Sequence, residues 1–139
     1  MKKKLNCILL IEDNEFTNIF NQKLIKALDI AEQVHITESG KEALDFLLNN
    51  TERESCQTPD IIFLDINMPG MNGWEFIEEL KERKKEKLAN SKIIMLTTSP
   101  NPDDEQKAKL IKEIIAFKRK PLTKGIINEV ITEYFPDYV

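Results

Sequence analysis

The sequence of 139 residues is poor in several residue types that build common kinds of site, since it holds one histidine, two cysteines and four glycines. A zinc centre of histidine and cysteine ligands is therefore disfavoured, and His35 is expected to be an ordinary strand residue. None of the four glycines belongs to a loop that could cradle phosphate groups, which argues against a flavin or nucleotide carrier. Cys7 and Cys56 make no disulfide framework, and we expect both thiols to be reduced.

The sequence also lacks a long apolar run and a basic cluster. The positively charged start at 1–4 resembles that of a signal peptide, but the apolar segment at 8–11 is too short and ends in two acids. A net charge of -4 gives no indication of the basic face that nucleic acid requires. We therefore expect a cytoplasmic protein that binds neither nucleic acid nor membrane and forms one domain over residues 1–139.

What the chain does contain is a repeated alternation of short apolar runs and amphipathic segments. Five runs predict strands, at 5–11, 34–36, 61–64, 92–98 and 114–117. A helical pattern follows each strand, so the sequence predicts an α/β fold with a doubly wound parallel sheet of five strands and five helices.

The helical patterns also predict which side chains face the core. The first helix is expected to pack through an apolar stripe with polar side chains such as Asn18 and Asn21 between its members, and the stripe consists of Phe16, Ile19, Phe20, Leu24 and Leu28. The third helix turns Trp74, Ile77 and Leu80 inward. The fourth begins at an Asn101 cap followed by Pro102 and offers the core only Ala108, Leu110 and Ile111.

Acidic residues follow two of the predicted strands. Glu12 and Asp13 end the first strand, and Asp65 ends the third. An aspartate at this position could simply start a turn. However, ligands of such sheets bind at the carboxyl ends of the strands, so the three carboxylates are expected to converge there, which makes the turn-only interpretation improbable.

Clustered carboxylates need a counter-charge, because two like charges about 4 Å apart repel by roughly 4 kcal/mol at an effective dielectric constant near 20. Hard oxygen ligands, including the backbone carbonyl of Asn67 in the following turn, suit Mg²⁺. Thr97 ends the fourth strand and Lys120 follows the fifth, at the same edge of the sheet. A metal, an ammonium group and a carboxylate nucleophile together predict phosphoryl transfer to an aspartate.

At these residues the chain resembles the receiver domain of two-component response regulators. The segment IEDN at 11–14 is similar to the acidic pair of that family, and FLDINMPGMNG at 63–73 to its phospho-acceptor segment. MLTTS at 95–99 and FKRKPLT at 117–123 are similar to its hydroxyl-bearing strand end and its lysine-proline ending. The resemblance covers almost the whole chain and implies the flavodoxin-like strand order 2-1-3-4-5.

The resemblance implies a role for each matching residue. Asp65 would accept a phosphoryl group from a sensor histidine kinase or a histidine phosphotransfer protein, giving an aspartyl phosphate. Mg²⁺ would be held by Asp13, Asp65, the Asn67 carbonyl and, through water, Glu12. Thr97 and Lys120 would bind the phosphoryl oxygens, and the family also implies a cis peptide bond between Lys120 and Pro121.

In this family a switch aromatic fills the space behind the hydroxyl residue, and here Phe117 would do so behind Thr97. Phe117 lacks the hydroxyl group that the family often has at this position. Glu113 and Ile114 stand where the family usually has glycine and alanine, which is expected to change the end of the fourth helix. Thr98 is larger than the usual residue beside the acceptor.

These observations predict a stand-alone response regulator of a phosphorelay whose output is a protein contact. One alternative is a phosphatase of the haloacid dehalogenase kind, which has a second acid two residues after its nucleophile, where this chain has Asn67. Another is a structural interaction module without phosphorylation, which the complete set of site residues disfavours. Neither the kinase nor the output partner follows from the sequence.

Overall fold

Five parallel strands form one sheet in the order β2-β1-β3-β4-β5, which confirms the predicted order and fold class. The computed structural model describes residues 3–49, 58–89, 91–98 and 101–138. The strands are β1 (Leu5–Ile11), β2 (Ala31–Thr37), β3 (Ile61–Asp65), β4 (Lys92–Thr97) and β5 (Ile114–Arg119). The helices are α1 (Glu15–Leu28), α2 (Gly40–Asn49), α3 (Gly73–Ala89), α4 (Pro102–Lys109) and α5 (Lys124–Tyr134).

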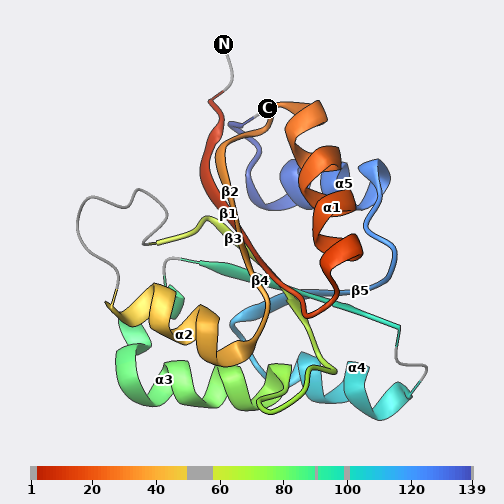
Figure 1. Ribbon diagram of the computed structural model, residues 1–139. Helices are drawn as coiled ribbons and strands as arrows, with labels where there is room; N and C mark the ends of the chain where they lie inside the picture. Colours follow the sequence, from red (N-terminus) through yellow and green to blue (C-terminus); the bar gives the residue numbers. More distant parts are fainter. Residues whose placement is uncertain (1–2, 50–57, 90, 99–100, 139) are drawn as a thin grey trace.

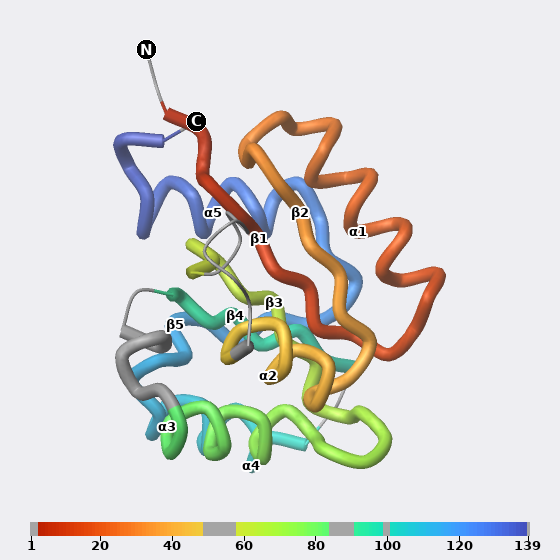
Figure 2. The backbone as a smooth tube through the Cα atoms, turned by 60° about the vertical axis from the view of Figure 1, so that its left-hand side comes forward, coloured from red at the N-terminus to blue at the C-terminus, as the bar shows by residue number. Residues whose placement is uncertain are grey.

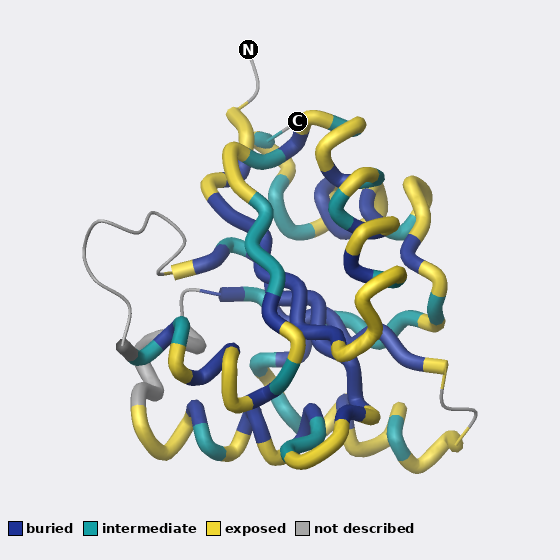
Figure 3. Tube along the Cα trace, viewed as in Figure 1, coloured by how far each residue is buried: buried dark blue, intermediate teal, exposed yellow. Residues whose placement is uncertain are grey.

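The helices cover both faces of the sheet (Figures 1 and 2). α1 and α5 lie on one face, and α2, α3 and α4 lie on the other. Successive side chains of a strand point to opposite faces, so Ile62 and Leu64 of β3 join the core on the α2 and α3 side, whereas Ile61 and Phe63 join the core on the α1 and α5 side. The three central strands β1, β3 and β4 are accordingly buried along most of their length, whereas the edge strands β2 and β5 are largely half-buried (Figure 3). Among the helices that the structure describes, none combines the length and apolarity needed to cross a membrane.

The first two turns of α1 face the opposite way to the prediction. Phe16, Ile19 and Phe20 are 80%, 41% and 55% exposed, while the buried residues of the helix are Asn18, Asn21 and Ile25. Leu24 and Leu28 do pack against the core. The apolar stripe at the start of α1 is therefore a surface patch, and two amides occupy the sheet-facing side.

α4 is short, and Ala108 is the residue that it buries. Its Asn101 cap and leading Pro102 are as predicted, and the Asn101 side chain accepts the Asp103 N–H. Ala108 is buried, but Leu110 is 85% exposed, so the prediction that it contacts the core is wrong. The Lys107 ammonium lies 4.8 Å from the ring centre of Trp74 at the start of α3. This cation–π contact, of the kind described for lysine over indole, links α4 to α3.

β5 runs two residues further than predicted and ends at Arg119. The following Lys120–Pro121 peptide bond is cis, as the resemblance implied. Glu113, which precedes β5, has a side chain only 8% exposed, with the Lys81 ammonium 3.6 Å from its Oε1. The glycine-alanine pair usual in the family is thus replaced by a buried carboxylate that is paired with α3.

Cys7 lies buried in β1 and is disulfide-bonded. The prediction of a reduced thiol at Cys7 is therefore wrong, and Cys56 lies outside the described residues. Two cysteines can be bridged when the fold brings their Cβ atoms to about 4 Å. Spacing in the sequence does not reveal that proximity.

Candidate functional site

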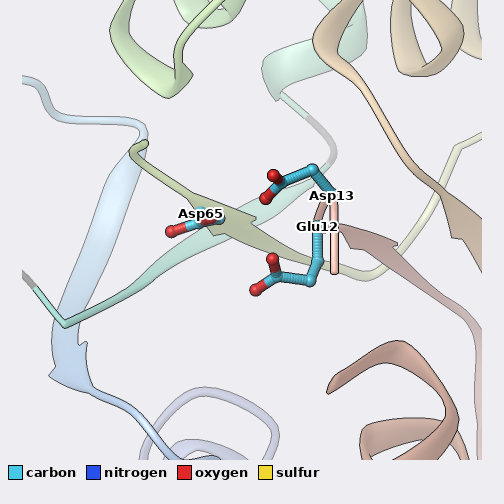
Figure 4. Close-up of side chains that lie close together, drawn as sticks. All are labelled: Glu12, Asp13 and Asp65. Atoms are coloured by element: carbon cyan, nitrogen blue, oxygen red, sulfur yellow. The ribbon is translucent and has the colours of Figure 1, made fainter. Parts of the chain in front are cut away.

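The register between β1 and β3 brings the acidic residues together. Ile11 pairs with Leu64, so Glu12 and Asp65 are the next residues along two neighbouring strands. Oxygen atoms from the carboxylates of Glu12, Asp13 and Asp65 all lie within 4.8 Å of one another (Figure 4). Glu12 and Asp65 are buried, whereas Asp13 is exposed at the surface end of the cluster. The predicted convergence of these three residues is confirmed.

Glu12 is held by hydrogen bonds through both its backbone and its side chain. Its N–H donates to the carbonyl of Thr37 at 3.1 Å. Its carbonyl accepts the Asn18 side-chain amide at 2.8 Å, and its Oε2 accepts the Asn14 N–H at 3.1 Å. The turn that carries Glu12 and Asp13 is therefore fixed to β2 and to α1.

Lys120 approaches the cluster from the end of β5. Its backbone N–H donates to the carbonyl of Thr97 at 3.0 Å, which joins the ends of β4 and β5. Its ammonium forms an ion pair with Glu12 Oε1 and lies 3.4 Å from Asp65 Oδ1. Thr97 itself is completely buried. The ends of β1, β3 and β5 thus bring three carboxylates and one ammonium to the same site.

The turn after β3 packs tightly against the backbone of Asp65. The backbone of Asn67 hydrogen-bonds to the Asp65 carboxylate, and the Gly73 N–H donates to the Ile66 carbonyl at 2.8 Å. A Cβ atom at Gly73 would lie 2.6 Å from the Asp65 carbonyl oxygen. Gly70, in the same turn, has φ 77°, a conformation that glycine adopts without strain. These features hold β3 and α3 in close contact.

Burial raises the pKa of the Asp65 and Glu12 carboxyl groups above their usual range. The Lys120 ammonium opposes this effect at both groups by favouring their charged forms. The neighbouring carboxylates add to this effect, because Asp13 raises the pKa of Asp65 and Asp65 raises the pKa of Glu12. The cluster therefore carries an electrostatic cost in its fully ionised form.

This cost predicts a pH dependence for the protein in EDTA. A carboxyl group whose pKa is higher in the folded state stabilises the fold below its unfolded pKa, and that stability is lost as the pH rises through the folded pKa. Asp65→Asn removes such a group, so the melting temperature of this variant should rise relative to that of the wild type as the pH increases above about 4. Thermal melts at a series of pH values measure this difference. Asp103→Asn, at an exposed aspartate of α4, is the matched control, and an equal gain there would contradict the explanation.

The donor set of this cluster fits a hard divalent cation. It offers carboxylate oxygens from three residues and has the backbone of Asn67 alongside. Oxygen ligands of this kind favour Mg²⁺ over zinc. His35 lies on β2, where its ring stacks on Phe46 with centroids 3.9 Å apart, as befits an ordinary strand residue.

Phe117 lies away from the cluster, in the middle of β5. It pairs in register with Met95 of β4 and packs, partly buried, against the core on the α2, α3 and α4 side. Thr97 is two residues beyond Met95, so both Thr97 and Phe117 belong to that face of the sheet. Asn14 and Asn18, which bond to Glu12, were not predicted as site residues. Asn14 directly follows the acidic pair in the sequence, whereas Asn18 lies five residues after it and carries no comparable signal.

The segment that contains these residues matches a known protein family. The sequence profile of the response regulator receiver domain matches residues 8–132. The chain is a member of that family. This receiver domain is 34% identical over 97 residues to response regulator Rcp1 of Synechocystis sp., a match that covers 70% of the chain but only 65% of Rcp1.

Further comparisons find similar segments in a longer protein and in a solved structure. It is 28% identical over 133 residues to hybrid signal transduction histidine kinase L of Dictyostelium discoideum, covering 95% of the chain and 7% of the kinase. The crystal structure of a two-component response regulator from Cytophaga hutchinsonii superimposes with a TM-score of 0.84 and 32% identity, covering 94% of this chain and 97% of that one. Two-component signalling is thus the function of the family to which the receiver domain belongs.

Proposed function

We propose that this receiver domain accepts a phosphoryl group on Asp65 from a phosphohistidine of a sensor kinase or a phosphotransfer protein. The observation that carries the proposal is the placement of the Asp65 carboxylate between two further carboxylates and the Lys120 ammonium. Few structural roles need three carboxylates with only one ammonium group beside them at the carboxyl edge of a parallel sheet.

Each residue of the cluster has a part in this proposal. Glu12, Asp13, Asp65 and the Asn67 carbonyl would hold Mg²⁺, which when bound neutralises charge on the acceptor and on the phosphoryl oxygens. Lys120 turns from its ion pair with Glu12 toward the phosphoryl group, and the Thr97 hydroxyl donates a hydrogen bond to it. An Asp65 oxygen forms the new P–O bond as the P–N bond of the phosphohistidine breaks, and the bonding electrons return to the imidazole nitrogen.

Intact mass after incubation with Mg²⁺ and a small phosphodonor tests this function. One added phosphoryl group that decays slowly supports a receiver domain that catalyses only its own phosphorylation and dephosphorylation. Multiple turnover of phosphate esters would instead indicate a phosphatase, which the amide of Asn67, in place of a second acid, makes a poor candidate. The absence of any adduct would support the third alternative, a structural interaction module that is not phosphorylated.

We also propose that the phosphodonor protein contacts the exposed face of α1. Phe16 and Phe20 border a hollow of about 480 Å³ that extends to Lys120 and Pro121. Exposed aromatic side chains beside a reactive site are typical anchors of protein interfaces. The match to a receiver segment inside a histidine kinase is in keeping with a donor of this class.

Phe16→Ala is expected to slow phosphoryl transfer from the cognate donor protein by about tenfold, because an interface anchor commonly contributes more than about 1 kcal/mol. Phosphorylation by a small phosphodonor should stay unchanged. Leu110→Ala is the matched control, since Leu110 is 85% exposed and Phe16 80%. Equal transfer rates in the two variants would exclude α1 as the contact.

The output of the proposed function is a second protein contact on the surface of α4, β5 and α5. Phe117 lines a hollow between α4 and β5 together with Ala108 and Ile114. Movement of the Thr97 hydroxyl toward a phosphorylated Asp65 would make room for Phe117 on the same face of the sheet. The Phe117 ring then carries the change from the acceptor to this surface by burial alone, without a hydroxyl group to satisfy.

Two further parts of the proposal are a single domain over residues 1–139 and a cytoplasmic location. The disulfide at Cys7 is the feature that runs against a reducing compartment. Alkylation of thiols at the moment of cell lysis, followed by mass measurement of the tryptic peptides, decides this point.

A further inference from the structure

Asn18 is a buried amide on the sheet-facing side of α1. Its side chain is 2% exposed, and the other residues buried on this helix are Asn21 and Ile25. Burial of a primary amide is unfavourable unless its polar atoms find partners. Apolar side chains are the usual occupants of such a position.

Only half of the Asn18 amide is satisfied. Its Nδ2 donates to the carbonyl of Glu12 at 2.8 Å, whereas its Oδ1 has no hydrogen-bond partner within the described part of the chain. Leucine has nearly the same size and shape without either polar atom, and would be the more stable choice at a buried helical site. The bond to Glu12 is therefore the feature that an asparagine provides and a leucine does not.

The carbonyl that Asn18 holds belongs to the peptide between two of the acidic residues. A peptide unit is planar, so fixing the orientation of the Glu12 carbonyl also fixes the position of the Asp13 Cα atom in the same plane. Glu12 has further anchors at its N–H and its carboxylate. Asn18 is the side chain that acts on the Glu12–Asp13 peptide itself.

We propose that Asn18 is a positioning residue for the cation site, orienting the Glu12–Asp13 peptide so that the Asp13 carboxylate faces Asp65. This inference rests on the proposed Mg²⁺ binding by the acidic cluster. Side chains that orient metal ligands without touching the metal commonly change metal affinity by about 10- to 100-fold when removed.

The test compares Asn18→Leu with the wild type in two measurements, the Mg²⁺ dissociation constant from calorimetric titration and the melting temperature in EDTA. The expected result is an unchanged or higher melting temperature together with Mg²⁺ affinity weakened by about tenfold. Asn21→Leu is the matched control, because Asn21 is also buried and lies one turn further from Glu12. Its Mg²⁺ affinity should equal that of the wild type.

Asn18→Ala covers the case in which leucine does not fit, and the same loss of affinity is expected from it. Wild-type affinity in a folded Asn18 variant, with binding lost in Asp13→Ala, would overturn the positioning role and leave the cation site intact. Equal losses of affinity and melting temperature at positions 18 and 21 would show a purely structural role. Absence of Mg²⁺ binding in the wild type would instead overturn the cation site itself.

Discussion

Asp65→Asn is expected to abolish labelling by any phosphodonor, protein or small molecule, because the amide lacks the nucleophilic oxygen that forms the P–O bond. It should also weaken Mg²⁺ binding, since one of the three clustered carboxylates is lost. Intact mass after exposure to a phosphodonor and calorimetric titration with Mg²⁺ measure the two effects. The expected phosphorylation is zero rather than reduced.

Asp103→Asn serves as the control for this substitution, because it removes a carboxylate from the exposed first turn of α4 and should leave labelling unchanged. Undiminished labelling of Asp65→Asn would show that another residue is the acceptor. Asp13→Ala adds a second comparison, in which the acceptor remains but Mg²⁺ affinity should fall further than in Glu12→Ala, whose carboxylate is engaged by Lys120.

Gly73→Ala is expected to lower the free energy of unfolding by about 1–3 kcal/mol, the range typical of overpacked substitutions. The added Cβ would lie 2.6 Å from the Asp65 carbonyl oxygen and 3.1 Å from the Ile66 Cα, and neither backbone atom can rotate away. The displacement would reach the acceptor itself, so phosphorylation by a small phosphodonor should slow as well. Urea unfolding and the labelling rate measure the two effects.

Gly125→Ala is the matched control for this prediction. A Cβ at Gly125 would meet nothing closer than the Thr123 hydroxyl at 3.7 Å. Gly125 also lies within α5, where alanine is favoured over glycine by up to about 1 kcal/mol. This variant should be at least as stable as the wild type, and equal stabilities for the two alanine variants would contradict the close contact at Gly73.

The fold and most of the acidic cluster could be predicted from the sequence because both depend on local signals. Apolar runs with turn residues between them indicate the strands, and the carboxyl ends of parallel strands share one edge. That Glu12 and Asp65 meet also requires β1 and β3 to be neighbours, and this strand order was implied by the family resemblance. The roles of Thr97 and Phe117 are predictions of a different kind, carried by family resemblance.

The orientation of α1 could not be predicted in the same way. Helical spacing identifies an apolar stripe of Phe16, Ile19 and Phe20, but it does not say whether that stripe faces the sheet or the solvent. The side of α1 that faces the sheet is defined by tertiary contacts, namely the packing of Leu24, Ile25 and Leu28 and the hydrogen bond from the Asn18 amide to the Glu12 carbonyl. A surface patch of the same residues is what a docking interface would require.

The contact between Trp74 and Lys107 has a spectroscopic consequence. Trp74 is the only tryptophan of the chain, it directly follows the glycine packed on Asp65, and its ring has an α4 ammonium 4.8 Å from its centre. Indole emission responds to the charge next to the ring. The receiver domain therefore carries an intrinsic fluorophore between its acidic cluster and α4, and its emission should report cation binding at the proposed site without a label.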